Sequence, residues 1–142
     1  MPLVSVIIPT FNYGKFISRA INSIFSQSFN DFDIIVVDHG STDNTRDIVT
    51  SFGGVLRYIN QEKKGAAFAR NVGIEVSTGK YIGFLDADDY FDKDNLRRKI
   101  EILETCSSVG WVYSDWQYID DNGNYLGRGS IRFNYSNKNL NP

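Results

Sequence analysis

Residues 33–44 of the chain have the sequence DIIVVDHGSTDN, and this stretch decides the fold. Its apolar run is short and almost continuous, which is typical of a strand covered on both faces, as the strands of a parallel sheet are. Gly40 permits a turn after the strand, and Ser41 or Thr42 is placed to cap a following helix. The stretch therefore predicts a strand, a turn and a helix, the unit from which parallel α/β folds are built.

The same alternation continues on both sides of this stretch. A run rich in β-branched residues at 3–8 predicts a strand, which we expect Pro9 to end because proline cannot donate a hydrogen bond to a neighbouring strand. The pattern predicts further strands at 56–59, 81–85 and 111–119, helices at 15–25, 66–76 and 96–103, and a hairpin turn at 120–123. We therefore predict an α/β sandwich with a mostly parallel central sheet flanked by helices.

Length and composition limit the classes of protein to which the chain can belong. Its 142 residues fit one compact domain, which we place at residues 1–127, with a polar tail at 128–142. A net charge of −2 argues against nucleic acid as a partner, because such proteins bind phosphates with clustered basic residues. The single cysteine excludes an internal disulfide, and the sequence contains no transmembrane segment. We expect a cytoplasmic protein, either free in the cytoplasm or at the cytoplasmic face of the membrane.

Candidate ligand-binding residues follow three of the predicted strands, at the edge where a parallel sheet binds its ligands. They are Thr10, Phe11 and Asn12 after the first strand, Asp38 and His39 after the second, and Asp86, Asp88 and Asp89 after the fourth. Three carboxylates within four residues repel one another, and a hard cation such as Mg²⁺ or Mn²⁺ relieves that repulsion. The pattern therefore indicates a divalent metal. The alternative is that one aspartate caps the following helix while the others are solvated.

A basic segment at residues 63–71, with the sequence KKGAAFARN, lies around a glycine that precedes a helix. Lys64, Arg70 and the free N–H groups after Gly65 are suited to bind a phosphate or a diphosphate. The alternative is a solvated loop in which Arg70 pairs with a neighbouring aspartate. The phosphate-binding loops of P-loop and Rossmann enzymes are absent, because PTFNYG follows the first strand, and no G-x-S-x-G nucleophile motif occurs.

Four stretches in this order resemble the family 2 glycosyltransferases of the GT-A fold. They are VSVIIPTFN at 4–12, VVDHGSTD at 36–43, GAAFARNVG at 65–73 and GKYIGFLDADD at 79–89, and the resemblance covers roughly residues 3–119. It implies inverting transfer of a sugar from a nucleotide-diphosphate donor, usually a UDP-sugar, to an acceptor hydroxyl. The acceptor would be a saccharide or a lipid-linked molecule, as in polysaccharide biosynthesis.

The resemblance also implies roles for individual residues. The triplet Asp86-Ala87-Asp88 is similar to the D-x-D motif of the family, in which the last carboxylate holds the metal on the diphosphate and a preceding one can contact the ribose. The expected metal ligands are Asp88, Asp86 and Asp89, for Mn²⁺ or Mg²⁺. The expected donor-binding residues are Pro9, Thr10, Phe11, Asn12, Asp38, His39, Lys64, Gly65, Arg70, Asn71, Asp86 and Ala87.

The chain departs from the family pattern in two places. His39 stands where the family commonly has an aspartate that faces the uracil ring, so the base preference is open. The general base of the family lies well past the D-x-D motif, and we assign none here, because Asp115 qualifies by its chemistry only. We therefore expect a truncated donor-binding part, with residues 128–142 starting an acceptor-side region. The alternatives are a non-catalytic nucleotide-sugar-binding module and a nucleotidyltransferase of GT-A-like fold.

Overall fold

The structure, a computed structural model, describes residues 1–129, so most of the predicted tail at 128–142 lies outside the described residues. The chain divides into two compact units, Met1–Ile100 and Glu101–Pro142. The predicted boundary at residue 127 stays a prediction. The first unit contains β1 (Val4–Thr10), α1 (Gly14–Phe25), β2 (Phe32–Asp38), α2 (Thr45–Ser51), the short 3-10 helix η1 (Gly53–Val55), β3 (Arg57–Asn60), α3 (Ala66–Val76), β4 (Tyr81–Phe84) and the start of α4 (Asn95–Thr105).

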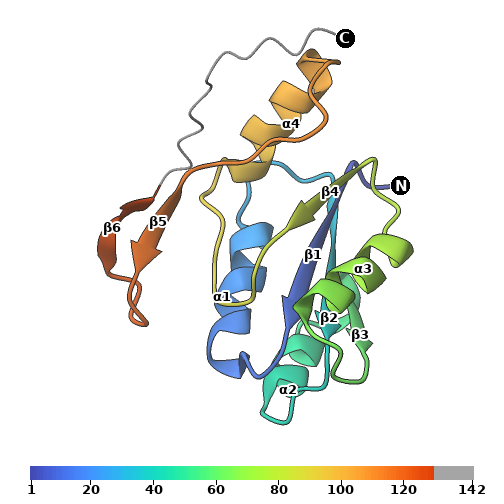
Figure 1. The fold of residues 1–142 in the computed structure, drawn as a ribbon, viewed down its shortest axis with the longest axis vertical. Coiled ribbons are helices and arrows are strands. Elements are labelled where there is room, and N and C mark those ends of the chain that lie inside the picture. The colour runs from blue at the N-terminus through green and yellow to red at the C-terminus, as the bar shows by residue number, and fades with distance from the viewer. Residues whose placement is uncertain (130–142) are drawn as a thin grey trace, which may run out of the picture. The chain divides into compact units, whose positions relative to one another are not determined.

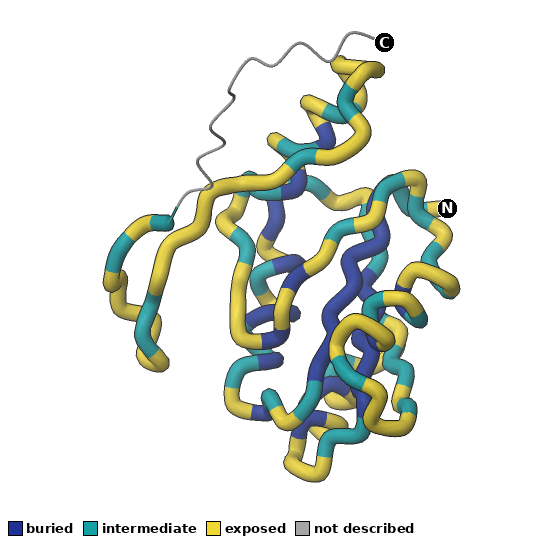
Figure 2. Tube along the Cα trace, in the orientation of Figure 1, coloured by how far each residue is buried: buried dark blue, intermediate teal, exposed yellow. Residues whose placement is uncertain are grey.

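The sheet of the first unit is parallel throughout, in the order β3-β2-β1-β4 (Figure 1). This arrangement confirms the predicted α/β class with a mostly parallel central sheet. The central strand β1 pairs with β2 on one side and with β4 on the other, and it is buried along its whole length (Figure 2). The carboxyl ends of β1 and β2 finish in register at Thr10 and Asp38, which places the residues that follow them at one edge.

Two helices cover opposite faces of this sheet, because alternate residues of a strand point to opposite sides. Ala69, Val72 and Val76 of α3 pack on the face that carries Ile7 and Ile35. Gly73 allows α3 to approach β1 closely, since a Cβ at this position would overlap the side chain of Ile7. The other face holds the buried residues Val6, Ile8, Ile34 and Val36, and the buried stripe of α1 consists of Ile17, Ala20, Ile21 and Ile24.

Two details of the first unit differ from prediction. Pro9 does not end its strand, because β1 continues to Thr10. Backbone groups alternate in direction along β1: Ile7 accepts a hydrogen bond from Leu85 on the β4 side, whereas Thr10 accepts one from His39 on the β2 side. The nitrogen of Pro9 therefore faces the β4 side, where β4 has already ended and no hydrogen bond is lost.

The start of α2 is the second difference. The helix begins at Thr45, so neither Ser41 nor Thr42 caps it. The carboxylate of Asp43 performs the capping contacts instead, accepting hydrogen bonds from the Thr45 N–H (3.0 Å) and the Thr45 hydroxyl (2.5 Å). It also accepts one from the Gly14 N–H (3.0 Å) at the start of α1. Asp43 thus connects the first turns of two helices.

The second unit contains an antiparallel hairpin of β5 (Trp116–Ile119) and β6 (Tyr125–Gly129), joined at the predicted turn. The Asp120 carboxylate accepts hydrogen bonds from the N–H groups of Asn122 (2.9 Å) and Asn124 (2.8 Å) across that turn. The strand predicted from residue 111 begins only at Trp116, which pairs with Gly129 of β6. No helix within residues 1–129 has the length and apolarity needed to cross a membrane.

Candidate functional site

A cleft of about 680 Å³ lies at the carboxyl ends of β1, β2 and β4. It brings together the ends of three strands and the start of α3, all within the first unit. The lining residues are Pro9, Thr10, Phe11, Asn12, Tyr13, His39, Ala66, Arg70, Asp86, Ala87 and Asp88. Eight of the twelve expected donor-binding residues and two of the three expected metal ligands are among them, so the cleft unites most of the residues that the sequence singled out.

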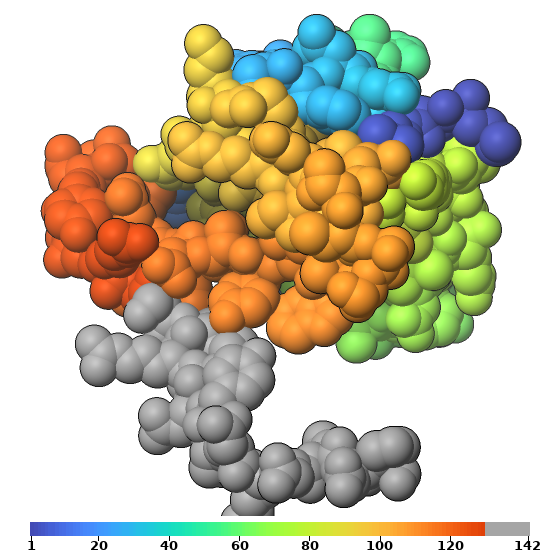
Figure 3. All heavy atoms as spheres, turned by 90° about the horizontal axis from the view of Figure 1, so that it is seen from above, coloured from blue at the N-terminus to red at the C-terminus, as the bar shows by residue number. Residues whose placement is uncertain are grey.

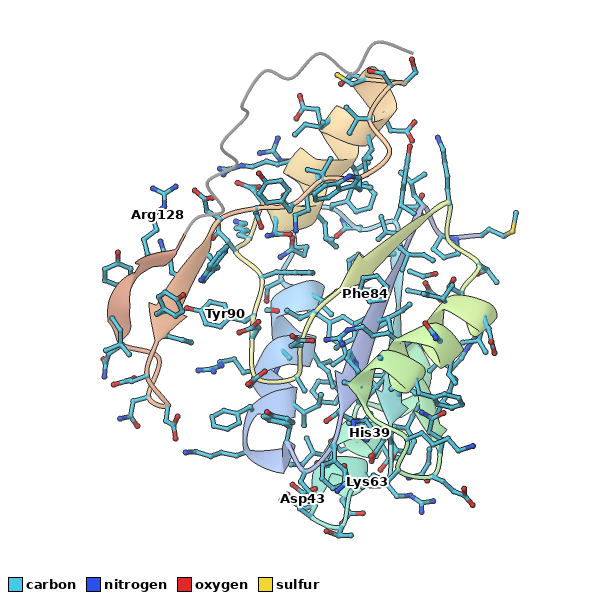
Figure 4. The ribbon with its side chains drawn as sticks, viewed as in Figure 1. His39, Asp43, Lys63, Phe84, Tyr90 and Arg128 are labelled. Carbon is cyan, nitrogen blue, oxygen red and sulfur yellow. The ribbon has the colours of Figure 1, made fainter. Side chains whose placement is uncertain are left out.

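One end of the cleft carries stacked rings. The Phe11 and His39 rings have centroids 5.2 Å apart and planes inclined by 14°. The ammonium group of Lys63 lies 3.9 Å from the centroid of the Phe11 ring, a cation–π contact, and Figure 4 shows His39 and Lys63 at the same end of the sheet. Gly40 has a φ of 93°, and a Cβ there would meet the backbone nitrogen of Lys63 at 3.3 Å. The glycine therefore lets the Lys63 loop lie against the turn that follows β2.

Two buried polar atoms of this cleft lack a hydrogen-bond partner within the described residues. They are the hydroxyl oxygen of Thr10, a residue 1% exposed, and Nδ1 of His39, a residue 7% exposed. Buried polar groups are normally hydrogen-bonded, because leaving one unpaired costs roughly 1–3 kcal/mol. Both residues line the cleft, so a ligand that enters it can supply the missing partners.

Asn12 connects the loop after β1 with the turn after β2 through hydrogen bonds. It has a φ of 58°, a left-handed conformation that asparagine tolerates better than most residues. Its N–H donates to the Ser41 hydroxyl (2.8 Å), and its side-chain oxygen accepts from the Thr42 N–H (2.8 Å). The structure therefore gives Ser41 and Thr42 a role in fixing the shape of the cleft edge.

Asp38 lies beneath the cleft and does not line it. Adjacent strand residues point to opposite faces, so His39 faces the cleft while Asp38 is fully buried. The Asp38 carboxylate accepts hydrogen bonds from the Ser41 N–H (2.8 Å) and the Tyr58 hydroxyl (2.7 Å). Burial and this hydrogen bond raise the pKa of Tyr58 to about 12. Asp38 thus holds the turn that carries His39, and its direct contact with a donor stays a prediction.

The acidic side of the cleft consists of Asp86 and Asp88. The Arg70 guanidinium forms an ion pair with the Asp86 carboxylate, as the alternative interpretation of the basic segment foresaw. Tyr13 forms a side-chain hydrogen bond with Asp88, whose negative charge raises the pKa of the tyrosine. Asp89 does not line the cleft; burial raises the pKa of its carboxyl, and the charges of Asp88 and Asp86 raise it further.

The carboxylates of the cleft fit a divalent cation only in part. Within residues 1–129, no three Asp, Glu, His or Cys side chains are arranged as a ready metal cage. Mg²⁺ and related ions are commonly held by one or two carboxylates, with the remaining positions filled by water and substrate phosphates. Asp86 and Asp88 supply that number of carboxylates, so the site suits a metal that arrives with a phosphate ligand. The place of Asp89 in the set stays a prediction.

Several expected residues lie outside the cleft, and two unexpected residues lie in it. Lys64 contacts the Phe68 ring (5.0 Å from Nζ to the centroid), and neither it nor Gly65 nor Asn71 lines the cleft. Gly65 precedes α3 with a φ of 89°, a conformation that favours glycine. Tyr13 and Ala66 were not expected in the cleft, although Tyr13 directly follows the 4–12 stretch and Ala66 lies within the 65–73 stretch. Their position beside or within these stretches is the sequence signal that could have identified them.

Comparison with known proteins adds relatives of known name. The WfgD protein of Escherichia coli, a UDP-Glc:α-D-GlcNAc-diphosphoundecaprenol β-1,3-glucosyltransferase, is 32% identical over 96% of this chain and 56% of its own length. The Staphylococcus aureus TarS fragment 1–349 in complex with UDP-GlcNAc superposes with a TM-score of 0.65 at 32% identity, over 72% of this chain and 31% of that one.

A third relative was solved with a metal ion. The mannosyltransferase PcManGT of Pyrobaculum calidifontis, in complex with GDP-Man and Mn²⁺, has a TM-score of 0.60 at 30% identity, over 63% of this chain and 28% of that one. The chain spans from 19% to 56% of the length of the first curated relatives that it matches. The structural neighbours confirm the expected GT-A fold. The sequence matches the family model "Glycosyl transferase family 2" over residues 5–141, and the chain therefore belongs to that family.

Proposed function

We propose that this chain carries the donor site of a glycosyltransferase that transfers a sugar from a nucleotide-diphosphate donor, a UDP-sugar first of all, to an acceptor hydroxyl with inversion. The observation that carries the proposal is the composition of the cleft. One end has two stacked rings and two buried polar atoms without a hydrogen-bond partner within the described residues. The other end has two carboxylates beside an arginine. A nucleotide sugar has the matching sequence of groups: a flat base, a ribose and a charged diphosphate.

The base belongs at the Phe11 and His39 end in this proposal. The rings offer an apolar, flat wall, and the Thr10 hydroxyl and His39 Nδ1 offer a hydrogen-bonding pair that lacks partners within the described residues. A pyrimidine edge presents a donor and acceptors to such a pair. The UDP and UDP-GlcNAc complexes of TarS support a uridine donor, and the GDP-Man complex of PcManGT shows that a structural relative takes guanosine.

The diphosphate belongs at the Arg70, Asp86 and Asp88 end. The Arg70–Asp86 pair is partly exposed, with 34% and 51% of the two side chains accessible, so it contributes at most about 1 kcal/mol and a phosphate can replace it. Asp88, with Asp86 as second ligand, would hold Mn²⁺ or Mg²⁺, and such an ion would offset charge on the leaving diphosphate. Arg70 then remains available to bind a phosphate oxygen.

The acceptor side of the reaction has no assigned residue. Asp86 and Asp88 are the carboxylates among the residues that line the cleft, and both are committed to the donor here. Asp115 forms a hydrogen-bonded ion pair with Arg128 (2.8 Å), which suits a structural role better than that of a base. The WfgD name supports a lipid-linked saccharide as the class of acceptor.

A calorimetric titration of the full chain with UDP, UDP-sugars, GDP-sugars and nucleoside triphosphates, each with and without Mn²⁺, tests the proposal. We expect UDP-sugars to bind, and to bind at least tenfold more tightly with Mn²⁺. Tight binding of nucleoside triphosphates in preference to any nucleotide sugar would favour a nucleotidyltransferase. Equal nucleotide-sugar affinity with and without Mn²⁺ would favour a non-catalytic binding module.

A further inference from the structure

The segment between β4 and α4, residues 85–94, contains neither helix nor strand, yet it carries Asp86 and Asp88. Its backbone hydrogen bonds within the described residues lie mainly at its two ends: Leu85 donates to Ile7, Lys93 accepts from Ser28, and Asp92 and Asp94 accept from Asn95 and Arg98 of α4. Between these ends, Asp89 donates to Asp86. A segment with so little backbone support depends on side chains for its position. Besides Arg70 on Asp86 and Tyr13 on Asp88 in the cleft, such side chains come from α1 and the residues directly after it.

Gln27 makes the most extensive of these contacts. It is 5% exposed, and its amide forms three hydrogen bonds: Nε2 donates to the carbonyls of Ser23 (3.0 Å) and Asp92 (2.8 Å), and Oε1 accepts from the Leu96 N–H (2.9 Å). One buried amide therefore joins the end of α1, the segment behind the cleft and the first turn of α4. Its donors and its acceptor are both satisfied, which makes the arrangement specific.

Two further residues extend this contact toward the cleft. The Ser23 hydroxyl accepts a hydrogen bond from the Phe91 N–H (3.0 Å) and donates one to the Ala20 carbonyl (2.7 Å). The Arg19 guanidinium donates to the Asp88 carbonyl (3.1 Å) and lies 5.3 Å from the centroid of the Tyr90 ring. Figure 3 shows light-blue atoms from α1 and the residues after it packed directly against the yellow atoms of the segment that follows β4.

The order of these contacts is the central observation. Arg19, Ser23 and Gln27 are spaced four residues apart, so they form one stripe at helical spacing. The groups that they bind follow the same order along the segment: the Asp88 carbonyl, the Phe91 N–H and the Asp92 carbonyl. Each side chain of the stripe therefore holds a backbone group that lies further along the segment than the one before it.

We infer that Gln27, Ser23 and Arg19 are positioning residues, whose stripe holds the 85–94 segment so that the Asp88 carboxylate stays in the cleft. This inference rests on the proposed function for the role of Asp88 as a metal ligand. Arg19 contributes at the Asp88 carbonyl itself, and Gln27 anchors the far end of the segment. Without the anchor, the segment samples more conformations, and Asp88 meets the diphosphate-bound cation in fewer of them.

The test compares Gln27→Met, which keeps the side-chain volume and removes all three hydrogen bonds, with Ser23→Ala, which removes the acceptor for Phe91. Ser18→Ala is the matched control, because Ser18 lies on the same helix and its hydroxyl accepts a hydrogen bond from the exposed Asn22 side chain (3.3 Å) of that helix. Amide hydrogen exchange of the full chain is one readout. The other is the affinity for UDP, measured by calorimetry with and without Mn²⁺.

We expect exchange at residues 86–90, read at the hydrogen-bonded N–H of Asp89, to accelerate at least tenfold in Gln27→Met, and by a smaller factor in Ser23→Ala, while exchange in β1 and β2 stays as in the wild type. The gain in UDP affinity from Mn²⁺ should fall at least fivefold, and the affinity without metal should change less than twofold. Acceleration of equal size in β1 and β2 would show a merely structural role and overturn the inference, as would unchanged exchange at 86–90. If the wild type itself shows no Mn²⁺ gain, the proposed function fails, while the exchange data still decide whether the stripe holds the segment.

Discussion

At the scale of single residues, the neighbouring pair Asp38 and His39 shows what the sequence could and could not predict. The strand-end rule correctly placed His39 in the cleft, because parallel strands share one carboxyl edge. The same rule placed Asp38 there as well, and the structure buries it beneath the turn instead. The sequence shows that Asp38 and His39 point to opposite sides of the strand. It does not show which of the two side chains points into the cleft, because that depends on tertiary partners, here Tyr58 and Ser41.

The basic segment shows the same limit. Of its three cations, Lys64 and Arg70 were expected to bind the donor, and the structure separates them: Arg70 lines the cleft, Lys63 lies on the Phe11 ring, and Lys64 lies on the Phe68 ring. Lys63 reaches Phe11 because Gly40 lets its loop approach the β2 turn. Such long-range contacts between loops leave no periodic pattern in the sequence, so spacing alone could not rank the lysines.

The His39→Asp variant tests the base end of the proposed site. A carboxylate only accepts hydrogen bonds, so it favours uracil, which presents a ring N–H, over cytosine, which presents a bare ring nitrogen. We expect the ratio of UDP to CDP affinity to rise roughly tenfold, the size of one charged hydrogen bond. Competition titrations with the two nucleotides measure it.

Asn22→Asp provides the control for this variant, because it adds a negative charge on α1 at a residue that does not line the cleft. We expect it to leave the UDP to CDP ratio within twofold of the wild type. If the ratio is also unchanged in His39→Asp, the residue does not face the base, and the assignment of that end of the cleft is wrong.

At the scale of elements, periodicity predicted every helix and strand of the first unit apart from the short 3-10 helix, and misplaced several ends. One misplaced end depends on a partner strand: β1 passes Pro9 because β4 has already stopped on that side. The start of α2 depends on Asp43, which shares its carboxylate with Gly14 of another helix. A capping rule that considers one helix at a time cannot foresee a shared cap.

The shared cap leads to a prediction about acid stability. Burial raises the pKa of Asp43, but the hydrogen bonds from Thr45 and Gly14 outweigh it and leave the pKa below its ordinary value of 3.8. A lowered folded-state pKa means that this stabilisation is complete above about pH 3.8 and is lost as the pH falls through the folded-state value. Asn has one acceptor oxygen where Asp43 uses two, so Asp43→Asn should lower the free energy of unfolding by about 1 kcal/mol at pH 7, and by less at pH 3.

Urea unfolding of both proteins at a series of pH values checks this expectation. Asp47→Asn serves as the comparison, because it removes a charge from the first turn of the same helix without touching Gly14 or Thr45. A difference between wild type and Asp43→Asn that is constant from pH 7 to pH 3 would show that the charge of Asp43 contributes nothing to the cap.

At the scale of the whole molecule, the fold explains why separated motifs form one site. The parallel order β3-β2-β1-β4 brings the ends of β1, β2 and β4 to one edge, and α3 adds Arg70 from the adjoining helix. The sequence could predict this convergence, since it follows from parallel strands alone. It could not predict how α1 supports the acidic segment, because those contacts join side chains to backbone groups far along the chain.

The central claim is that Asp88 makes nucleotide binding depend on a divalent cation. The decisive measurement is the calorimetric affinity for UDP, with and without Mn²⁺, of the wild type, Asp88→Asn, Asp89→Asn and the charge control Asp47→Asn. We expect Mn²⁺ to tighten UDP binding at least tenfold in the wild type and in Asp47→Asn, and to have no effect in Asp88→Asn. Asp89→Asn should retain most of the gain, because its side chain does not line the cleft. A full Mn²⁺ gain in Asp88→Asn would contradict the account.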